Sequence, residues 1–241
     1  MKLGLIGHKE DARGRTLLLR DILLPDLAYP ESFDLMFGLT PDRDDLGNIV
    51  RGVCALAGPG HKCRWADQLN KRLTDVFAEQ VLREYENFGY VPGDDSTDRG
   101  CYALDVMNRW RKVGLFGGRK IEAFAQVDFL NRDEVRKAAF LLGGVFFCFA
   151  LPKRVASGDI FEADTWDVAE DDGGNLGGHL VWGAEVVNSW GLNVRVTDAF
   201  RSRYCFDAYA TMSAEDLAPG GRAFSGLDLA GLRRALSAVT A

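Results

Sequence analysis

A histidine and an asparagine on one predicted β-hairpin are the first residues whose types and spacing could do chemistry. Residues 177–191 read GGHLVWGAEVVNSWG, in which two short apolar runs are joined at Gly183. Glycine at the first central position is typical of a type II′ turn, and a two-residue turn fixes the strand register. His179 then lies directly opposite Asn188, whose amide can orient the imidazole, and Trp190 follows to cover the pair. This hairpin predicts a general base and the group that orients it.

A cysteine in the first half of the chain is the candidate nucleophile. Cys54 follows the turn-forming residues Gly47 and Gly52 and begins a helix-forming run. In the first turn of a helix, free N–H groups and the helix dipole lower the pKa of a thiol. Asn48 comes six residues before Cys54 and can donate a side-chain N–H to an oxyanion. With His179, these residues are the parts of a nucleophilic hydrolase.

The order and spacing of these four residues resemble the papain-like cysteine peptidases. That superfamily carries an amide side chain six residues before its cysteine, and a later histidine paired with the asparagine of an Asn-Ser-Trp-Gly motif. Asn48, Cys54, His179 and Asn188 match these positions in order. The segment before Cys54 looks most like that of small, uncharacterised papain-fold proteins of bacteria and phages. The resemblance implies a cysteine peptidase or amidase-type hydrolase that works through a thioacyl intermediate, without a cofactor or a metal.

Helical patterns dominate the first half of the chain and strand patterns the second. Apolar residues at helical spacing predict helices over residues 65–88 and 98–113, after the helix that begins at Cys54. The second half predicts strands over 120–127, 144–151 and 204–212 around the hairpin, a short helix over 133–142 and a closing amphipathic helix over 227–239.

This order of elements predicts an α+β fold. The resemblance implies a papain-like two-lobed form of it, with the nucleophile helix in a helical N-terminal lobe and an antiparallel, β-barrel-like C-terminal lobe. We expect one domain over residues 1–241, made of an N-terminal arm (1–45), the helical lobe (46–115) and the β lobe with the C-terminal helix (116–241).

Two residues of the nucleophile helix call for separate predictions. Pro59 removes a backbone hydrogen bond and crowds the preceding turn, so we expect the helix to kink or to begin twice. His61 shares a helix face with Cys54 but would lie about 10 Å farther along the axis. We interpret His61 as a hydrogen-bonded packing histidine rather than as the base.

Composition excludes several classes of function. The net charge of −6 and a pI near 5.2 argue against a nucleic-acid binder. The longest apolar stretch, residues 138–151, is too short to span a bilayer, and the N-terminal apolar run is too short for a signal peptide. Five cysteines cannot all pair, which fits a reducing compartment. We expect a protein that is cytoplasmic at synthesis and binds neither nucleic acid nor membranes; association with a virion is compatible with this.

The segment before His179 is strongly acidic. No Lys or Arg occurs between Val155 and Val194, whereas Asp and Glu are frequent there. An acidic lip at the site would favour a cationic peptide or protein substrate. A solvated loop explains the same composition, and we favour that interpretation.

Three alternatives to a peptidase stay open at this point. The first is a catalytically inactive papain-fold subunit with a structural or interaction role, for instance in a phage particle. The second is transglutaminase-like acyl transfer to an amine. The third, a metal-dependent hydrolase, is weak, because His8, His61 and His179 show no metal-ligand spacing.

Overall fold

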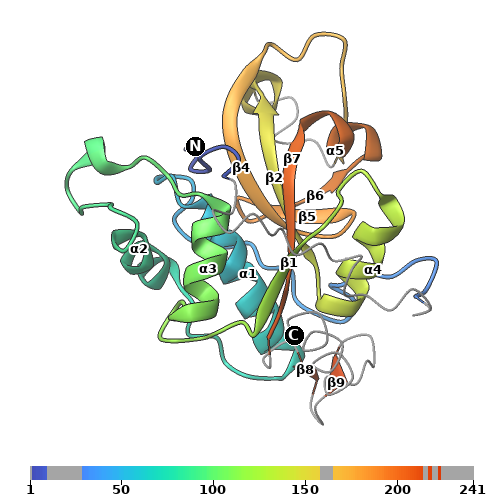
Figure 1. The fold of residues 1–241 in the computed structure, drawn as a ribbon, viewed down its shortest axis with the longest axis horizontal. Coiled ribbons are helices and arrows are strands. Elements are labelled where there is room, and N and C mark those ends of the chain that lie inside the picture. The colour runs from blue at the N-terminus through green and yellow to red at the C-terminus, as the bar shows by residue number, and fades with distance from the viewer. Residues whose placement is uncertain (1, 10–28, 158–164, 214–216, 219–221, 224–241) are drawn as a thin grey trace.

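The computed structural model describes residues 2–9, 29–157 and 165–213 and the backbone of residues 217–218 and 222–223. The helix expected over 227–239 and the start of the acidic segment lie outside the described residues. Figure 1 shows a central sheet with α1, α2 and α3 on one side and α4 and α5 on the other. The helices are α1 (Cys54–Leu69), α2 (Ala78–Glu86), η2 (Asp95–Thr97), α3 (Ala103–Lys112), α4 (Arg132–Leu142), η3 (Lys153–Ser157) and α5 (Asp198–Tyr204).

The sheet is built almost entirely from the second half of the chain. Its seven strands lie in the order β1-β7-β2-β4-β5-β6-β3, and only β3 and β6 pair in parallel. The predicted α+β layout is therefore correct, but the sheet is open rather than closed into a barrel. The strands are β1 (Ala123–Gln126), β2 (Val145–Pro152), β3 (Thr165–Trp166), β4 (Asn175–Gly183), β5 (Val186–Ser189), β6 (Leu192–Val196), β7 (Cys205–Met212) and the separate pair β8 (Leu217–Ala218) and β9 (Arg222–Ala223).

The sheet separates two hydrophobic cores, because successive side chains of a strand point to opposite faces. On β4, Leu180 and Trp182 join the core beneath α1, whereas Val181 joins the core beneath α4 and α5. Both cores take residues from β2 in the same alternating way. Which face a β4 side chain occupies therefore decides whether it can meet the nucleophile helix.

Helix α1 is continuous from Cys54 to Leu69 with Pro59 inside it, so the expected second start is wrong. The glycines on either side of the proline let the helix lie close to its neighbours. A Cβ at Gly58 would come within 2.4 Å of Leu180, and one at Gly60 within 2.6 Å of Leu46. Tight packing of a buried helix offsets the hydrogen bond that Pro59 removes.

The helix predicted over 65–88 is two helices in the structure. The first ends at Leu69, and Lys71 then adopts a positive φ of 55°, which a helix cannot continue through. The helix predicted to begin at residue 98 begins at Ala103 instead. The residues before it are used for backbone pairing, because Cys101 bridges Leu5.

Residues 2–9 form an extended strap between the helical half and the sheet. Leu5 pairs with Cys101 on one side and with Gly178 on the other. The Leu5 N–H donates to Gly178 at 3.2 Å, and the Ile6 N–H donates to Cys101 at 2.9 Å. Ion pairs add to this backbone pairing: Lys2 with Asp98, His8 with Asp207, and Lys9 with Asp105.

A buried lysine ties α1 to the elements on which it packs. The Lys62 ammonium donates to the carbonyl of Leu142 at 2.8 Å and to both the carbonyl and the hydroxyl of Thr211, at 3.0 and 2.8 Å. These groups end α4 and lie near the end of β7. The nucleophile helix is thus hydrogen-bonded to both α4 and the sheet. None of the described helices is long and apolar enough to cross a membrane.

Candidate active site

Cys54 is the first residue of α1 and is completely buried. Burial raises the pKa of its thiol to about 11, although backbone N–H groups of Leu180, Gly4, Ala55 and Cys54 itself act in the opposite direction. Two of these donors belong to the helix terminus, one to β4 and one to the strap. The cysteine is therefore where the sequence predicted it, at a helix start, but as a protonated thiol.

His179 lies on β4, one residue before the strand residue whose N–H reaches the Cys54 thiol. Its Nε2 is 3.0 Å from Ser189 Oγ, and its ring stacks on Trp190 with centroids 3.9 Å apart. Its Nδ1 is buried and has no hydrogen-bond partner. Burial lowers the pKa of His179 to about 3, so the imidazole is neutral at pH 7.

The predicted pairing of His179 with Asn188 is wrong. In the structure Trp182 lies opposite Asn188 and Gly183 opposite Val187, so the connection is longer than the expected two-residue turn. The longer connection slides the register and moves Asn188 away from His179. Asn188 then shares a face with Trp182, in the core beneath α1, whereas the His179 ring stacks on Trp190 in the other core.

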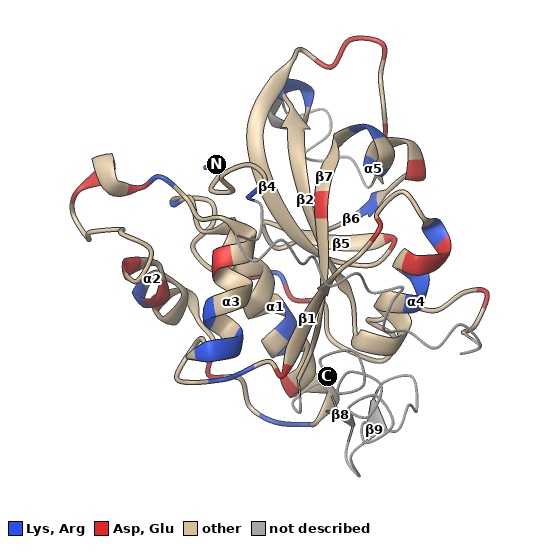
Figure 2. Cartoon of the chain, viewed as in Figure 1, with Lys and Arg blue, Asp and Glu red and all other residues tan. Residues whose placement is uncertain are grey.

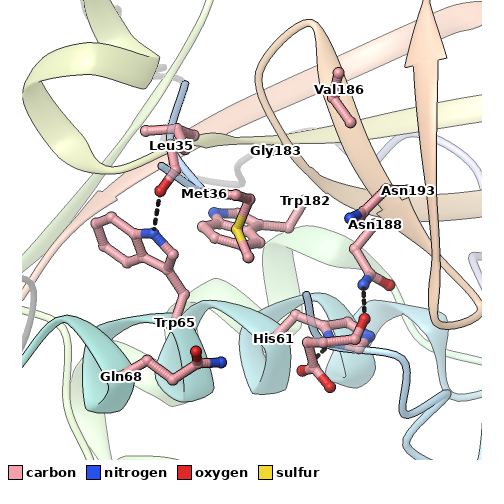
Figure 3. A pocket seen from close by; sticks show the side chains of 11 residues that line it. Leu35, Met36, His61, Trp65, Gln68, Trp182, Gly183, Val186, Asn188 and Asn193 are labelled. Carbon is pink, nitrogen blue, oxygen red and sulfur yellow. Dashed lines mark hydrogen bonds and ion pairs between the residues drawn. The ribbon is translucent and has the colours of Figure 1, made fainter. Parts of the chain in front are cut away.

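Asn188 instead belongs to a group around the middle of α1 (Figure 3). Its Nδ2 donates to the carbonyl of Asp42 at 2.8 Å, and its Oδ1 accepts from Gly191. The Asp42 carboxylate pairs with His61 at 2.9 Å and with Arg64 at 2.8 Å. Burial acts to raise the pKa of Asp42, but the hydrogen bond and charge of His61, with Arg64, outweigh it and lower that pKa.

His61 is thus a hydrogen-bonded packing histidine, as the sequence predicted. Only 4% of its surface is exposed. It lines a narrow pocket with Trp65 and Trp182, whose rings pack against each other in Figure 3. No nucleophilic side chain lines this pocket, so the His61–Asp42 pair has no evident chemistry to perform.

Asn48, the predicted oxyanion donor, is buried in the turn before α1. Its Oδ1 has no hydrogen-bond partner. An amide oxygen can only accept hydrogen bonds, so the unpaired Oδ1 does not bear on the N–H donation to an oxyanion that the sequence predicts. This arrangement is compatible with the predicted role but does not test it.

The strap covers the thiol. A Cβ on Gly4 would lie 1.7 Å from the carbonyl oxygen of Gly52, so the strap passes directly against the turn before Cys54. Gly100 and Gly178 flank the same passage, and a Cβ on either would lie about 2 Å from strap carbonyl oxygens. Sequence reasoning missed this contact, because a few paired residues far apart in the chain leave no periodic pattern.

Sequence reasoning also missed Ser189 as the partner of His179. The signal was present, since Ser189 is the second residue of the Asn-Ser-Trp-Gly motif.

The described part of the acidic segment hydrogen-bonds to α5 and to the residue before it: Asp167 accepts from Thr197, and Asp172 accepts from Arg203 and Tyr204. All five cysteines are buried and none forms a disulfide, and no group of His, Cys, Asp and Glu among the described residues could hold a metal ion.

No protein-family model matches the chain, and no curated protein matches it in sequence. Several solved structures are similar to this chain, among them two cysteine proteases. Xylellain, a cysteine protease from Xylella fastidiosa, superposes with a TM-score of 0.63 and 17% identity over 88% of this chain and 96% of its own. A Carica candamarcensis cysteine protease in complex with E-64 gives a TM-score of 0.51 and 15% identity over 77% of this chain and 99% of its own. Identities this low bear on the fold alone, and the chain therefore has the fold of papain-like cysteine proteases.

Proposed function

We propose that the protein is a cysteine peptidase or amidase-type hydrolase with Cys54 as nucleophile and His179 as base, described here in a latent form. One observation carries the proposal: the thiol at the start of α1 meets β4 one residue after His179, and the Nδ1 of that histidine has no partner. Ser189 holds the ring by a hydrogen bond at Nε2, and Trp190 stacks on the face of the ring. In the described form this imidazole lies on the face of β4 opposite to the thiol, so β4 must turn His179 toward α1 when the site opens.

The reaction follows from these parts. Once His179 faces α1, it takes the Cys54 proton on Nδ1, and the sulfur bonds to the carbonyl carbon of an amide in a peptide or protein substrate. The backbone N–H of Cys54 and the side chain of Asn48 stabilise the oxyanion. The imidazolium returns its proton to the leaving amine as the carbon–nitrogen bond breaks, and water then hydrolyses the thioester. Ser189 takes the orienting role that the sequence assigned to Asn188.

The latent form follows from the pKa values. A pKa near 11 for the thiol and near 3 for the imidazole leaves both groups neutral at pH 7, because burial disfavours every charged form. Withdrawal of the strap would admit water to Cys54 and relieve this cost at the thiol. The strap holds its place through backbone pairs and three side-chain contacts, in each of which the strap side chain is 43–49% exposed, so local opening is cheaper than unfolding.

Displacement of the strap in the full-length chain tests the proposal. A valine at Gly4 cannot fit against Gly52, whereas a Cβ at Gly7 meets nothing within 4 Å, which makes Gly7→Val the matched control. We expect iodoacetamide at pH 7 to label Cys54 in Gly4→Val at least about ten-fold faster than in the native chain or in Gly7→Val. Mass spectrometry identifies the labelled cysteine. Hydrolysis of labelled casein should follow the same order and vanish in Gly4→Val with Cys54→Ala.

A folded Gly4→Val protein whose Cys54 reacts no faster than its other cysteines would overturn the proposal. The second candidate, an inactive papain-fold subunit, would then be favoured. The observation on its side is the full burial of both Cys54 and His179 as neutral groups. Labelling of Cys54 without casein hydrolysis, but with incorporation of a fluorescent amine into casein, would indicate acyl transfer instead.

A further inference from the structure

A second cavity lies outside the proposed catalytic site, between α4, α5, the hairpin that joins β4 to β5, and residues 32–41. Its volume is about 490 Å³, within the range of roughly 300–1,000 Å³ that is usual for small-molecule sites. Met36 and Val186 also line the pocket of Figure 3, so the two cavities adjoin. Neither Cys54 nor His179 lines it.

Arginines from three elements converge on this cavity. Arg132 and Arg136 come from α4, Arg195 from β6 and Arg201 from α5. Figure 2 shows basic positions on both α4 and α5, with acidic ones beside them. Four guanidinium groups around one cavity repel one another unless anions neutralise them.

The carboxylates of the protein neutralise this group only in part. Asp198 pairs closely with Arg201, at 2.7 Å, but lies 3.4 Å from Arg132. Glu185 lies 3.5 Å from Arg132 and 4.0 Å from Arg136, beyond good hydrogen-bond range. The remaining acidic lining residue, Asp34, accepts the N–H of Met36.

Two arginines therefore retain unused donors. The Nε of Arg136 is buried and has no hydrogen-bond partner, and the side chain as a whole is 17% exposed. Buried donors are nearly always paired in folded proteins, so Arg136 is not fully satisfied by the described residues, and other atoms of its side chain line the cavity. Arg195 is exposed at the cavity and makes no ion pair with the described residues. Guanidinium groups bind carboxylates and phosphates through two parallel hydrogen bonds.

Part of the cavity wall is apolar, formed by Phe33, Leu39, Val135 and Ala139. We propose that this cavity is a binding site for a small organic oxyanion, a carboxylate or phosphate carried on an apolar body. Arg136 and Arg195 bind the oxyanion, and the apolar wall receives the rest of the ligand. The site is independent of the proposed peptidase chemistry, and its test measures binding alone.

Calorimetric titration of the full-length protein with phenyl phosphate, benzoate and inorganic phosphate, at constant ionic strength, tests this site. We expect saturable binding of phenyl phosphate or benzoate below about 10 mM, and at least about ten-fold weaker binding of inorganic phosphate, which cannot use the apolar wall. The stronger of the two organic probes identifies the preferred oxyanion. The melting temperature should rise with that ligand, because it binds only the folded state.

Substitutions locate the site. Arg136→Gln and Arg195→Gln should each lower the affinity for the organic probe about ten-fold or more. The control Arg83→Gln removes the same charge at an exposed site on α2 and should change that affinity less than about two-fold. Since Arg195 is exposed, its variant stays folded even if Arg136→Gln does not. Absence of saturable binding, equal affinity for inorganic phosphate, or undiminished binding by folded Arg195→Gln would each overturn the proposal.

Discussion

The two buried histidines, His61 on α1 and His179 on the far face of β4, have opposite surroundings. His61 pairs with the Asp42 carboxylate, which also binds Arg64. His179 has only a hydroxyl and an aromatic face, and one of its nitrogens is unpaired. His61 belongs to a hydrogen-bonded group in a pocket that no thiol or hydroxyl side chain lines, whereas His179 keeps one nitrogen that can accept a proton. The difference separates a histidine that holds the fold together from one that can act on a substrate.

The largest expected effect is on catalysis. In the strap-displaced Gly4→Val protein, His179→Gln should reduce casein hydrolysis by about 10²–10⁴, because it removes the general base. His61→Gln should leave the rate per folded molecule within about two-fold, since that ring does not meet the thiol. An equal loss of rate in both variants would break the distinction between the two histidines.

The next effect is on stability. Asp42→Ala leaves His61 and Arg64 without their shared carboxylate and should lower the free energy of unfolding by about 3 kcal/mol. Urea denaturation at pH 7 measures it. The hydrogen-bonding variant Asp42→Asn should recover part of the loss, and a loss below about 1 kcal/mol would mean that the pair does not hold the fold.

Acid should destabilise the two regions in different pH windows. The pKa of His179 falls from 6.5 in the unfolded chain to about 3 in the fold, so the unfolded chain binds the extra proton. Stability is then complete above pH 6.5 and falls by about 1.4 kcal/mol per pH unit below it. The pKa of Asp42 is lowered from 3.8, so its contribution is lost only below that pH.

Urea denaturation between pH 7 and pH 4.5 separates these contributions. The fall in the free energy of unfolding with decreasing pH should be present in the native chain and in Asp42→Asn. It should disappear in His179→Gln. A slope that survives in His179→Gln would show that other groups cause the acid sensitivity.

The smallest effect concerns the partner of the His179 ring. In the Gly4→Val background, Ser189→Ala should alter the pH profile of Cys54 alkylation and cost about 1 kcal/mol of stability, because it removes the ring's hydrogen bond. Asn188→Ala should leave that pH profile unchanged. The reverse result would mean that the hairpin shifts on opening to the register that the sequence predicted.

The fold class and most elements could be predicted from the sequence because they depend on local periodicity. The helix at α4 and the strands β2 and β7 lie within one or two residues of their expected bounds. The helical break after Leu69 could not be predicted, because it depends on the positive φ of Lys71, a non-glycine residue.

The candidate site was harder to predict than the fold. The position of Cys54 at a helix start depends on nearby turn residues, and the sequence indicates it correctly. The register of the hairpin depends on one residue of loop length, and an error there moves Asn188 to a different set of neighbours. The strap depends on pairing between residues about a hundred positions apart, for which one sequence carries no signal.

The buried ammonium of Lys62 limits how this protein can admit a substrate. Any hinge that swung α1 away from β7 would separate this ammonium from both oxygens of Thr211 within an apolar core, at a high cost. Access to Cys54 must therefore come by peeling away a short peptide rather than by a clamshell motion. A soluble peptide with the sequence of residues 2–9 should then act in trans as a competitive inhibitor of the strap-displaced enzyme.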